Sequence, residues 1–433
     1  VRPDNMGGTM KKIAIIGFGG AGYNAAREVR RRDAEAVIDV YSDTDTGPYN
    51  PMLTTYYVKG AIPYEALFPF GDLKTIQKEL NLHVYTNRPV TGLVPEKKKV
   101  QFDGGEALYD EILISTGASA VMPPIPGLDL PGVFKMRTAQ DAVELKRRLD
   151  SGEIKSGLVI GASWVGIKIV EDLVEREIPC ALVDGAEWMF YAAAFQETAL
   201  RVQKALEAKG VQVACGQMLD HIEREADGRL TAVMRGGGRF TAGTVAVCIG
   251  VRMNTGFLRD SGIAMNRGVL VDRRMRTNYE GIYAAGDCCE ALDIQSGVHR
   301  NIGVWFNANR QGAVAGANMA GSPEEFDANV LVNLAHYLDY DFISIGDAAA
   351  CGPEDEVYEY EDARYYIRAV RSGKTIKCIN MIGSADSNGI VKNAFIKAIE
   401  NPEAELDVRT VCFLRGKGFP DGFINFLGGK SLD

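Results

Sequence analysis

Short apolar runs that end at glycine-rich turns set the pattern of this chain. The run Ile13–Ile16 leads into a glycine-rich turn and an alanine-rich stretch of helical spacing, and a second run, Ala36–Tyr41, ends just before Asp43. Strand, glycine turn, helix and strand in this order predict a βαβ unit that binds a dinucleotide. The glycines, Gly17, Gly19 and Gly22, let the backbone approach a pyrophosphate, and the acid accepts a hydrogen bond from a ribose hydroxyl. A glycine turn without a ligand is the alternative.

The same order recurs near residue 160. The run Leu158–Ile160 leads into a turn at Gly161, Ser163 and Gly166, and the next run, Pro179–Val183, ends at Asp184. Ser163 stands where the motif has its middle glycine, which weakens this second match. Two such units in one chain favour paired domains for a flavin and a nicotinamide nucleotide over a dehydrogenase with a single dinucleotide.

Two further apolar runs also end at turns of small residues. The first, Tyr109–Ser115, is followed by Thr116 and Gly117, and the second, Thr277–Ala285, leads to Gly286 and Asp287. Between them, the proline-rich segment Pro123–Gly127 is stiff and suits a crossing between domains.

Composition narrows the class without naming a ligand. The chain has 433 residues, of which 46% are hydrophobic and 24% charged, as in soluble globular proteins. Lys and Arg number 48 against 57 Asp and Glu, and the net charge of −9 argues against nucleic acid or an anionic membrane as the main partner. The apolar runs are of strand length, so we expect no membrane span. Because the N-terminal residues also lack an apolar signal core, we expect a cytoplasmic protein.

Cysteine and histidine do not indicate a metal site. The eight cysteines are scattered without a CxxC pair, and the four histidines lack metal-ligand spacing. We therefore expect no metal ion and no iron–sulfur cluster within this chain, and reduced thiols in its core. Cys288 and Cys289 follow Asp287 directly, and a redox role for this pair is the alternative to buried packing.

Taken in order, the two glycine turns, the Thr116-Gly117 turn and the Gly286-Asp287 turn resemble the FAD- and NAD(P)H-dependent oxidoreductases of the pyridine nucleotide-disulfide oxidoreductase superfamily. Three segments look most similar to rubredoxin and ferredoxin reductases and to the flavin domain of assimilatory nitrite reductase: Pro48–Leu53, Ile249–Thr255 and Trp305–Gly312. The resemblance runs from about residue 11 to 320 and extends more loosely beyond.

The resemblance implies an α/β fold with two Rossmann-like dinucleotide-binding domains and a C-terminal α+β domain. The expected FAD domain comprises residues 10–120 and 248–322, and the NAD domain is inserted at 121–247. The remaining residues, 323–433, would serve dimerisation or cover the flavin. The apolar tail 413–427 either packs or docks a partner.

The resemblance also implies the residues that hold each cofactor. For FAD they are Gly17, Gly19, Gly22, Asp43, Thr116, Gly117, Arg137, Gly286, Asp287, Trp305 and a Gln311-Gly312 turn beside the flavin pyrimidine; a solvated Arg137 and a core Trp305 are the alternatives. For the nicotinamide nucleotide they are Gly161, Ser163, Gly166 and Asp184. The residues themselves favour NAD over NADP, because the Asp184 carboxylate repels a 2′-phosphate and its neighbours supply no cation.

Departures from the family pattern narrow the chemistry. Thiol-dependent relatives place a redox cysteine where this chain has Met52 or its immediate neighbours, and the first cysteine here is Cys180. Disulfide and peroxide chemistry therefore loses its nucleophile. Rubredoxin-reductase-like relatives hold a Lys–Glu pair beside the flavin, and the matching positions here are Tyr56 and Lys168. We hypothesise that Lys168 brings a cation to the flavin ring and raises its potential. A surface helix lysine is the alternative.

Together these observations predict an FAD-dependent enzyme that passes electrons between NAD(H) and a protein electron carrier. That carrier would be a ferredoxin, a rubredoxin or the iron–sulfur subunit of a larger complex, and the chain would be a homodimer or a subunit of a hetero-oligomer. Two alternatives remain open. One is a thiol-dependent NADH oxidase or disulfide reductase, and the other is an NADH-responsive flavoprotein binding module with little turnover.

Overall fold

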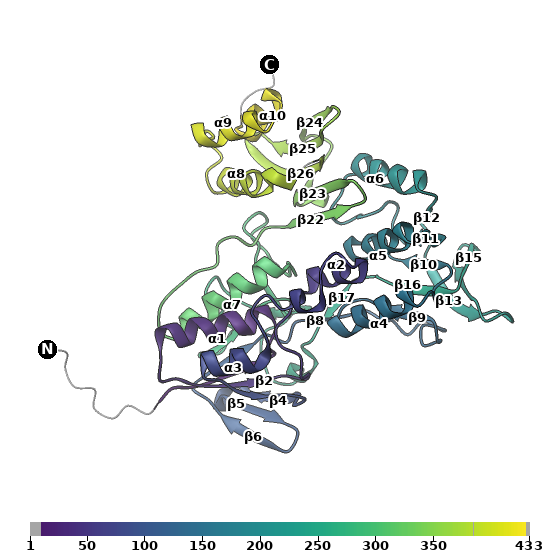
Figure 1. The fold of residues 1–433 in the computed structure, drawn as a ribbon. Coiled ribbons are helices and arrows are strands. Elements are labelled where there is room, and N and C mark those ends of the chain that lie inside the picture. The colour runs from purple at the N-terminus through teal and green to yellow at the C-terminus, as the bar shows by residue number, and fades with distance from the viewer. Residues whose placement is uncertain (1–9, 384, 430–433) are drawn as a thin grey trace. The chain divides into compact units, whose positions relative to one another are not determined.

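The computed structural model describes residues 10–383 and 385–429 (Figure 1). The chain forms two compact units, each built from two separate stretches. The first comprises the residues up to Ser119 together with Val251–Asn329, and the second comprises Ala120–Gly250 together with the residues from Val330 onward. The expected α/β fold class is confirmed, since each unit holds a parallel sheet of five strands and the second unit adds a C-terminal sheet.

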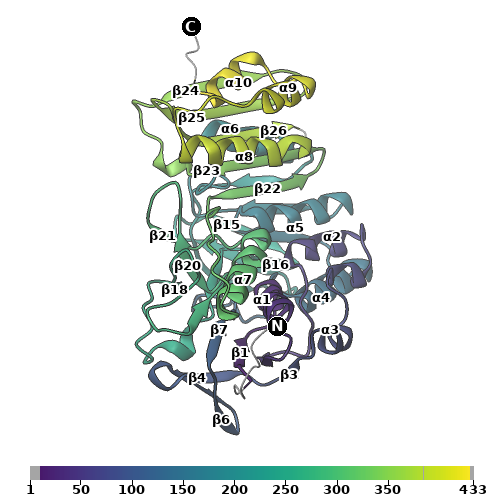
Figure 2. The ribbon, with the colours of Figure 1, turned by 90° about the vertical axis from the view of Figure 1, so that its left-hand side faces the viewer.

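The parallel sheet of the first unit has the strand order β19-β7-β1-β2-β3. Its strands are β1 (Lys12–Ile16), β2 (Val37–Tyr41), β3 (His83–Tyr85), β7 (Glu111–Ile114) and β19 (Ile282–Ala284). After their first residues, Lys12 and Glu111, the central strands β1 and β7 are apolar and buried because both faces of a parallel sheet are covered. Two long helices, α1 (Gly20–Arg32) and α7 (Trp305–Met319), lie side by side in this unit (Figures 1 and 2).

Shorter elements complete the first unit. One is a three-stranded antiparallel sheet of β4 (Val90–Val94), β5 (Lys99–Phe102) and β6 (Gly105–Leu108). The remaining elements are the helices α2 (Thr54–Lys59) and α3 (Leu73–Leu80), and the strands β8 (Ala118–Ala120), β17 (Val251–Met253), β18 (Val269–Leu270), β20 (Cys289–Leu292) and β21 (His299–Arg300).

The second unit contains the other parallel sheet, with the strand order β12-β11-β10-β16-β9. Its strands are β9 (Val133–Lys135), β10 (Gly157–Ile160), β11 (Cys180–Val183), β12 (Gln212–Ala214) and β16 (Thr244–Val247). Three helices accompany it: α4 (Ala139–Asp150), α5 (Trp164–Glu175) and α6 (Gln196–Ala208). A small antiparallel sheet packs into the same core: β13 (Leu219–Arg224), β14 (Leu230–Met234) and β15 (Arg239–Ala242).

The C-terminal part of the second unit is an antiparallel sheet with the order β22-β23-β26-β25-β24. Its strands are β22 (Val332–Tyr337), β23 (Tyr340–Gly346), β24 (Glu356–Glu361), β25 (Tyr366–Ser372) and β26 (Thr375–Gly383), followed by the helices α8 (Asn388–Glu400), α9 (Val408–Gly416) and α10 (Asp421–Leu427) (Figure 2). Phe419, Phe423 and Phe426 are buried, so this stretch of the apolar tail packs within its own unit. Within residues 10–383 and 385–429, no helix has the length and apolar character needed to cross a membrane.

Candidate functional site

The first glycine turn joins β1 to α1 and leaves room where a phosphate is predicted. A Cβ on Gly17, which has a φ of 95°, would lie 2.4 Å from the Ser115 carbonyl oxygen, and one on Gly22 would lie 2.3 Å from the Gly17 carbonyl oxygen. A Cβ on Gly19 would meet no described atom within 4 Å. Gly19 is also the N-cap of α1, and no side chain of the described residues caps this helix. The first N–H groups of α1 are therefore available to an anion, which fits a pyrophosphate.

Two neighbouring features of the first unit lie at the same ends of the parallel strands. Asp43 is exposed just beyond β2. The Thr116-Gly117 turn, beyond β7, is held by Asn254: the Thr116 hydroxyl donates to the Asn254 carbonyl at 2.7 Å, and the Asn254 side chain donates to the Thr116 carbonyl at 3.0 Å. The Asn254 amide completes the clamp on the Gly117 carbonyl at 3.0 Å. Asn254 belongs to the segment Ile249–Thr255, which resembles relatives in sequence. In the structure it holds the Thr116-Gly117 turn in place.

The Gly286-Asp287 turn is joined to α7 through Gln311. The Gly286 amide donates to Gln311 Oε1 at 2.8 Å, and the Asn301 side chain donates to the Asp287 carbonyl at 3.1 Å. The expected Gln311-Gly312 turn is wrong, because both residues lie inside α7. Gly312 has a packing reason instead, since a Cβ there would lie 2.1 Å from a carbonyl oxygen of α1.

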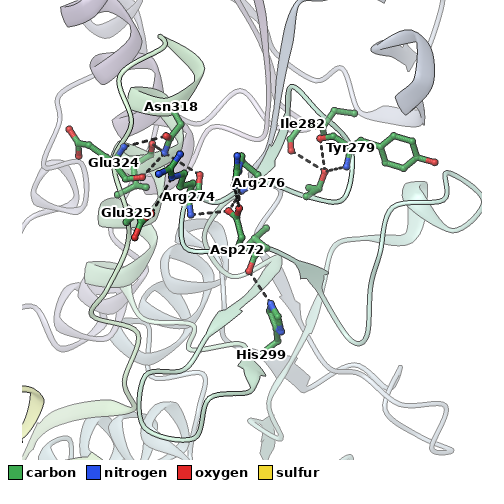
Figure 3. Close-up of polar contacts among 12 residues, drawn as sticks. Asp272, Arg274, Arg276, Tyr279, Ile282, His299, Asn318, Glu324 and Glu325 are labelled. Carbon is green, nitrogen blue, oxygen red and sulfur yellow. Dashed lines mark hydrogen bonds and ion pairs between the residues drawn. The ribbon is translucent and has the colours of Figure 1, made fainter. Parts of the chain in front are cut away.

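A polar network braces the segment that leads into β19, as Figure 3 shows. The Asp272 carboxylate accepts from the backbone N–H groups of Arg274 and Arg276, at 2.8 and 2.9 Å, and from the Arg276 side chain at 2.7 Å. Asn318, near the end of α7, donates to the Arg274 carbonyl at 3.2 Å and to the Glu324 carbonyl at 2.8 Å. The network ties the end of α7 to residues 272–276, and this segment is bonded to β19 because the Ala284 amide donates to the Met275 carbonyl at 3.0 Å.

Trp305 begins α7 and packs onto the start of α1. A Cβ on Gly20 would lie 2.6 Å from the Trp305 ring, and the ring stacks on Phe70 with centroids 5.7 Å apart. Tyr56 lies in α2 of the same unit. Trp305 is thus a half-buried neighbour of the predicted pyrophosphate turn, and its contact with a flavin stays a prediction.

The second glycine turn joins β10 to α5 and differs at its middle position. The Ser163 hydroxyl accepts from the Gly166 amide at 3.2 Å, which caps α5, and donates to the Cys248 carbonyl at 2.9 Å. Asp184 lies just beyond β11, where its carboxylate accepts from the Ala162 amide at 2.5 Å and from the Ala186 amide at 2.7 Å. Gly161, with a φ of 108°, keeps the tight turn of the motif. The turn is therefore intact, and Asp184 is held beside it.

Arg137 precedes α4 in the second unit. Its backbone amide donates to the Asp141 carboxylate at 3.0 Å, beside the capping box formed by Thr138 and Asp141. Its contact with a flavin phosphate stays a prediction.

Lys168 is buried within the second unit, with 7% of its surface exposed, so the alternative of a surface lysine is wrong. Its ammonium forms an ion pair with Glu171, which is fully buried, and donates to the His336 carbonyl at 2.6 Å. The Glu171 carboxylate also accepts from the Leu338 amide at 2.9 Å. We did not predict Glu171, although its spacing of three residues from Lys168 on a helix was a readable signal. The influence of Lys168 on a flavin stays a hypothesis.

Cys288 and Cys289 are buried and unlinked. The Cys288 thiol donates to the Ala285 carbonyl at 3.3 Å, and the Cys289 thiol donates to the Gly286 carbonyl at 3.3 Å. Burial raises the pKa of both thiols above its usual range. Since a thiolate is the reactive form, this environment favours packing over redox chemistry.

Two parallel sheets, each with a glycine turn at the start of a helix, define an oxidoreductase that uses two dinucleotides. The chain belongs to the pyridine nucleotide-disulphide oxidoreductase family, whose model matches residues 11–312. The expected resemblance is thus confirmed, and the protein is a flavoenzyme that uses FAD and a nicotinamide nucleotide.

Individual relatives carry different activities. An "NADH oxidase" of Methanocaldococcus jannaschii is 29% identical over 73% of this chain and 71% of its own length. A "NADH-dependent phenylglyoxylate dehydrogenase subunit epsilon" of Aromatoleum evansii is 28% identical over 83% of this chain and 85% of its own. The solved structure of an NADH:rubredoxin oxidoreductase from Clostridium acetobutylicum has the same fold, with a TM-score of 0.72 at 20% identity over 94% of this chain and 100% of that one.

Proposed function

We propose that this protein transfers electrons between NAD(H) and a protein electron carrier. The carrier is a ferredoxin, a rubredoxin or the iron–sulfur subunit of a larger oxidoreductase complex. The observation that carries the proposal is the residue at position 52: it is an exposed methionine at the start of a helical segment, where thiol-dependent relatives have a cysteine. Electrons must then leave the flavin without a thiol relay beside it.

The first unit would hold FAD and the second would hold NAD(H). Bound FAD would supply the chemistry that couples the two-electron hydride of NAD(H) to one-electron carriers. The residues of this chain bind the two cofactors and orient them. The open N-terminus of α1 and Gly19 receive the pyrophosphate, Gln311 keeps the Gly286-Asp287 turn in place, and Asp184 selects a ribose with a free 2′-hydroxyl.

Two relatives support a protein partner. The phenylglyoxylate dehydrogenase subunit, matched over most of its length, is by its name one part of a larger NADH-dependent enzyme. The structural neighbour from Clostridium acetobutylicum is named for rubredoxin. The proposal covers both directions of transfer, from NADH to the carrier and from the carrier to NAD⁺.

The M. jannaschii relative gives a second candidate function, NADH oxidase, and one experiment separates the two. The FAD-loaded protein is titrated with NADH without oxygen and then offered ferredoxin, rubredoxin, a viologen dye, coenzyme A disulfide or oxygen. Rapid reoxidation by the one-electron acceptors, with slow reaction of the disulfide and oxygen, is expected. Preferred reaction with oxygen or the disulfide would overturn the proposal. A long-lived charge-transfer band with every acceptor left oxidised would point instead to a binding module.

A further inference from the structure

One face of α5 is directed at the C-terminal sheet rather than at solvent. Trp164, Lys168 and Glu171 are spaced four and three residues apart, which places them on the same side of a helix. The Trp164 ring stacks on Phe342 of β23, with centroids 4.9 Å apart and planes inclined by 23°. Both ribbon views place α5 next to β22 (Figures 1 and 2).

The charged residues of this face bind the end of β22 and the turn that follows it. Lys168 donates to the His336 carbonyl, and Glu171 accepts from the amide of Leu338, which has a φ of 48° in the left-handed region. Lys168 and Glu171 also neutralise each other in the interior. Removing one partner of such a buried pair leaves the other charge uncompensated. Because each partner also bonds the backbone at the end of β22 or in the turn after it, losing one of them is expected to disturb that turn.

A second set of contacts holds the loop that follows Asp184. The Ala193 carbonyl accepts from the Ser344 hydroxyl at 2.6 Å and from the Asn380 side chain at 3.1 Å, while the Phe195 amide donates to Asn380 Oδ1 at 2.8 Å. Asn380 lies within β26 and is fully buried. A buried amide costs free energy unless it is hydrogen-bonded, and here the loop supplies partners for it.

This loop also touches the glycine turn. The Phe190 amide donates to the Ala162 carbonyl at 3.0 Å, and the Phe190 ring lies 4.6 Å from Trp164 and 5.2 Å from Phe342, centroid to centroid. The C-terminal sheet therefore supports both segments that border the second glycine turn, namely the first half of α5 and the loop beyond Asp184.

We propose that the C-terminal sheet is a structural part of the NAD(H) site, with Glu171 and Asn380 as positioning residues. They fix the start of α5 and the loop 185–195 in the arrangement that receives the dinucleotide. This inference rests on the assignment of NAD(H) to the second unit in the proposed function. It gives residues 330–429 a task distinct from dimerisation or from covering the flavin.

The test compares NADH affinity in three variants of the FAD-loaded full chain. Asn380→Leu removes the bonds to Ala193 and Phe195 at similar volume. The double variant Lys168→Met with Glu171→Leu replaces the ion pair by apolar side chains. Arg371→Met is the matched control: Arg371 is also buried in the C-terminal sheet, but it pairs with Glu356 and donates to the Phe426 carbonyl.

We expect NADH to bind roughly tenfold more weakly in the first two variants, with FAD content unchanged and NADH affinity unchanged in the control. Hydrogen exchange provides a second readout, since the Phe195 amide should exchange faster in Asn380→Leu and the Leu338 amide faster in the double variant. NADH affinity within twofold of wild type in both variants would overturn this inference and leave the proposed function standing. A wild-type protein that does not bind NADH would overturn the proposed function and this inference together.

Discussion

The two helices that follow the glycine turns, α1 and α5, begin alike and then differ in what they bury. α1 packs small residues against α7, where Gly312 and Gly316 allow the two backbones to approach. α5 buries Lys168, Glu171 and Asp172, and two of these bind the C-terminal sheet. The first glycine turn is thus supported by small residues and by neutral hydrogen bonds from Asn24 and Ser115, and the second by buried charged side chains. The motif fixes only the turn, and the surrounding fold decides how it is held.

The largest expected effects come from breaking each turn separately. A valine at Gly22 would place its Cβ 2.3 Å from the Gly17 carbonyl oxygen, and one at Gly166 would lie 2.0 Å from the Gly161 carbonyl oxygen. Overpacking against backbone cannot be relieved by a side-chain rotation. Gly22→Val is therefore expected to lose FAD, and Gly166→Val to retain FAD but bind NADH at least tenfold more weakly. The flavin-to-protein ratio and an NADH titration check both. Loss of FAD in Gly166→Val, with Gly22→Val still yellow, would reverse the assignment of the two turns.

A third buried residue of α5, Asp172, predicts an unusual pH dependence of stability. Asp172 is 1% exposed, and among the described residues its Oδ2 has no hydrogen-bond partner. Burial raises the pKa of Asp172 from 3.8 to about 8, against the opposing pull of the Arg176 and Lys168 charges. Between these two values the folded protein keeps a proton that the unfolded chain releases. As the pH rises through this window, the free energy of unfolding should therefore fall by about 1.4 kcal/mol for each pH unit, and it should level off above pH 8.

Asp172→Asn removes the titrating group, so this part of the pH dependence should disappear. Urea unfolding midpoints are measured at pH 6 and pH 8.5. The midpoint of the variant, relative to that of the wild type, should be higher at pH 8.5 than at pH 6. Asp150→Asn, at a half-exposed carboxylate, serves as the control. If the difference between the midpoints of Asp172→Asn and wild type is the same at both pH values, Asp172 is already ionised in the folded protein.

A smaller effect is expected at the middle position of the second turn. Ser163 caps α5, whereas Gly19 gives α1 no side-chain cap. Ser163→Ala should lower stability by about 1 kcal/mol, and Ser163→Gly, which restores the motif glycine, by less. Thermal unfolding of the FAD-loaded variants measures this. Equal melting temperatures for wild type and Ser163→Ala would show that the cap contributes nothing.

The smallest effect is expected at the thiols of the first unit. The double variant Cys288→Ser with Cys289→Ser should keep NADH-dependent turnover within about twofold, because both thiols are buried with raised pKa values and donate to backbone carbonyls. Steady-state assays with a viologen dye suffice. A collapse of turnover with FAD still bound would restore a redox role for this pair.

The parallel strands and their turns could be predicted because buried parallel strands appear in the sequence as continuous apolar runs, and glycines mark where they end. The Gln311-Gly312 turn was expected from the family resemblance and is wrong, because both residues lie inside α7, where the close approach of α1 requires a glycine at position 312. The role of Glu171 was also missed. Charged helix residues are usually exposed, and the backbone that Lys168 binds lies 168 residues further along the chain.

Single-turnover reoxidation of the flavin tests the proposed electron transfer most directly. The FAD-loaded protein is reduced with one equivalent of NADH under anaerobic conditions and mixed rapidly with an oxidised ferredoxin or rubredoxin, or with oxygenated buffer. We predict that flavin absorbance returns faster with at least one of the carriers than with oxygen. We also predict two equivalents of a one-electron carrier consumed per NADH. Faster reoxidation by oxygen, with both carriers left oxidised, would contradict the proposed electron transfer.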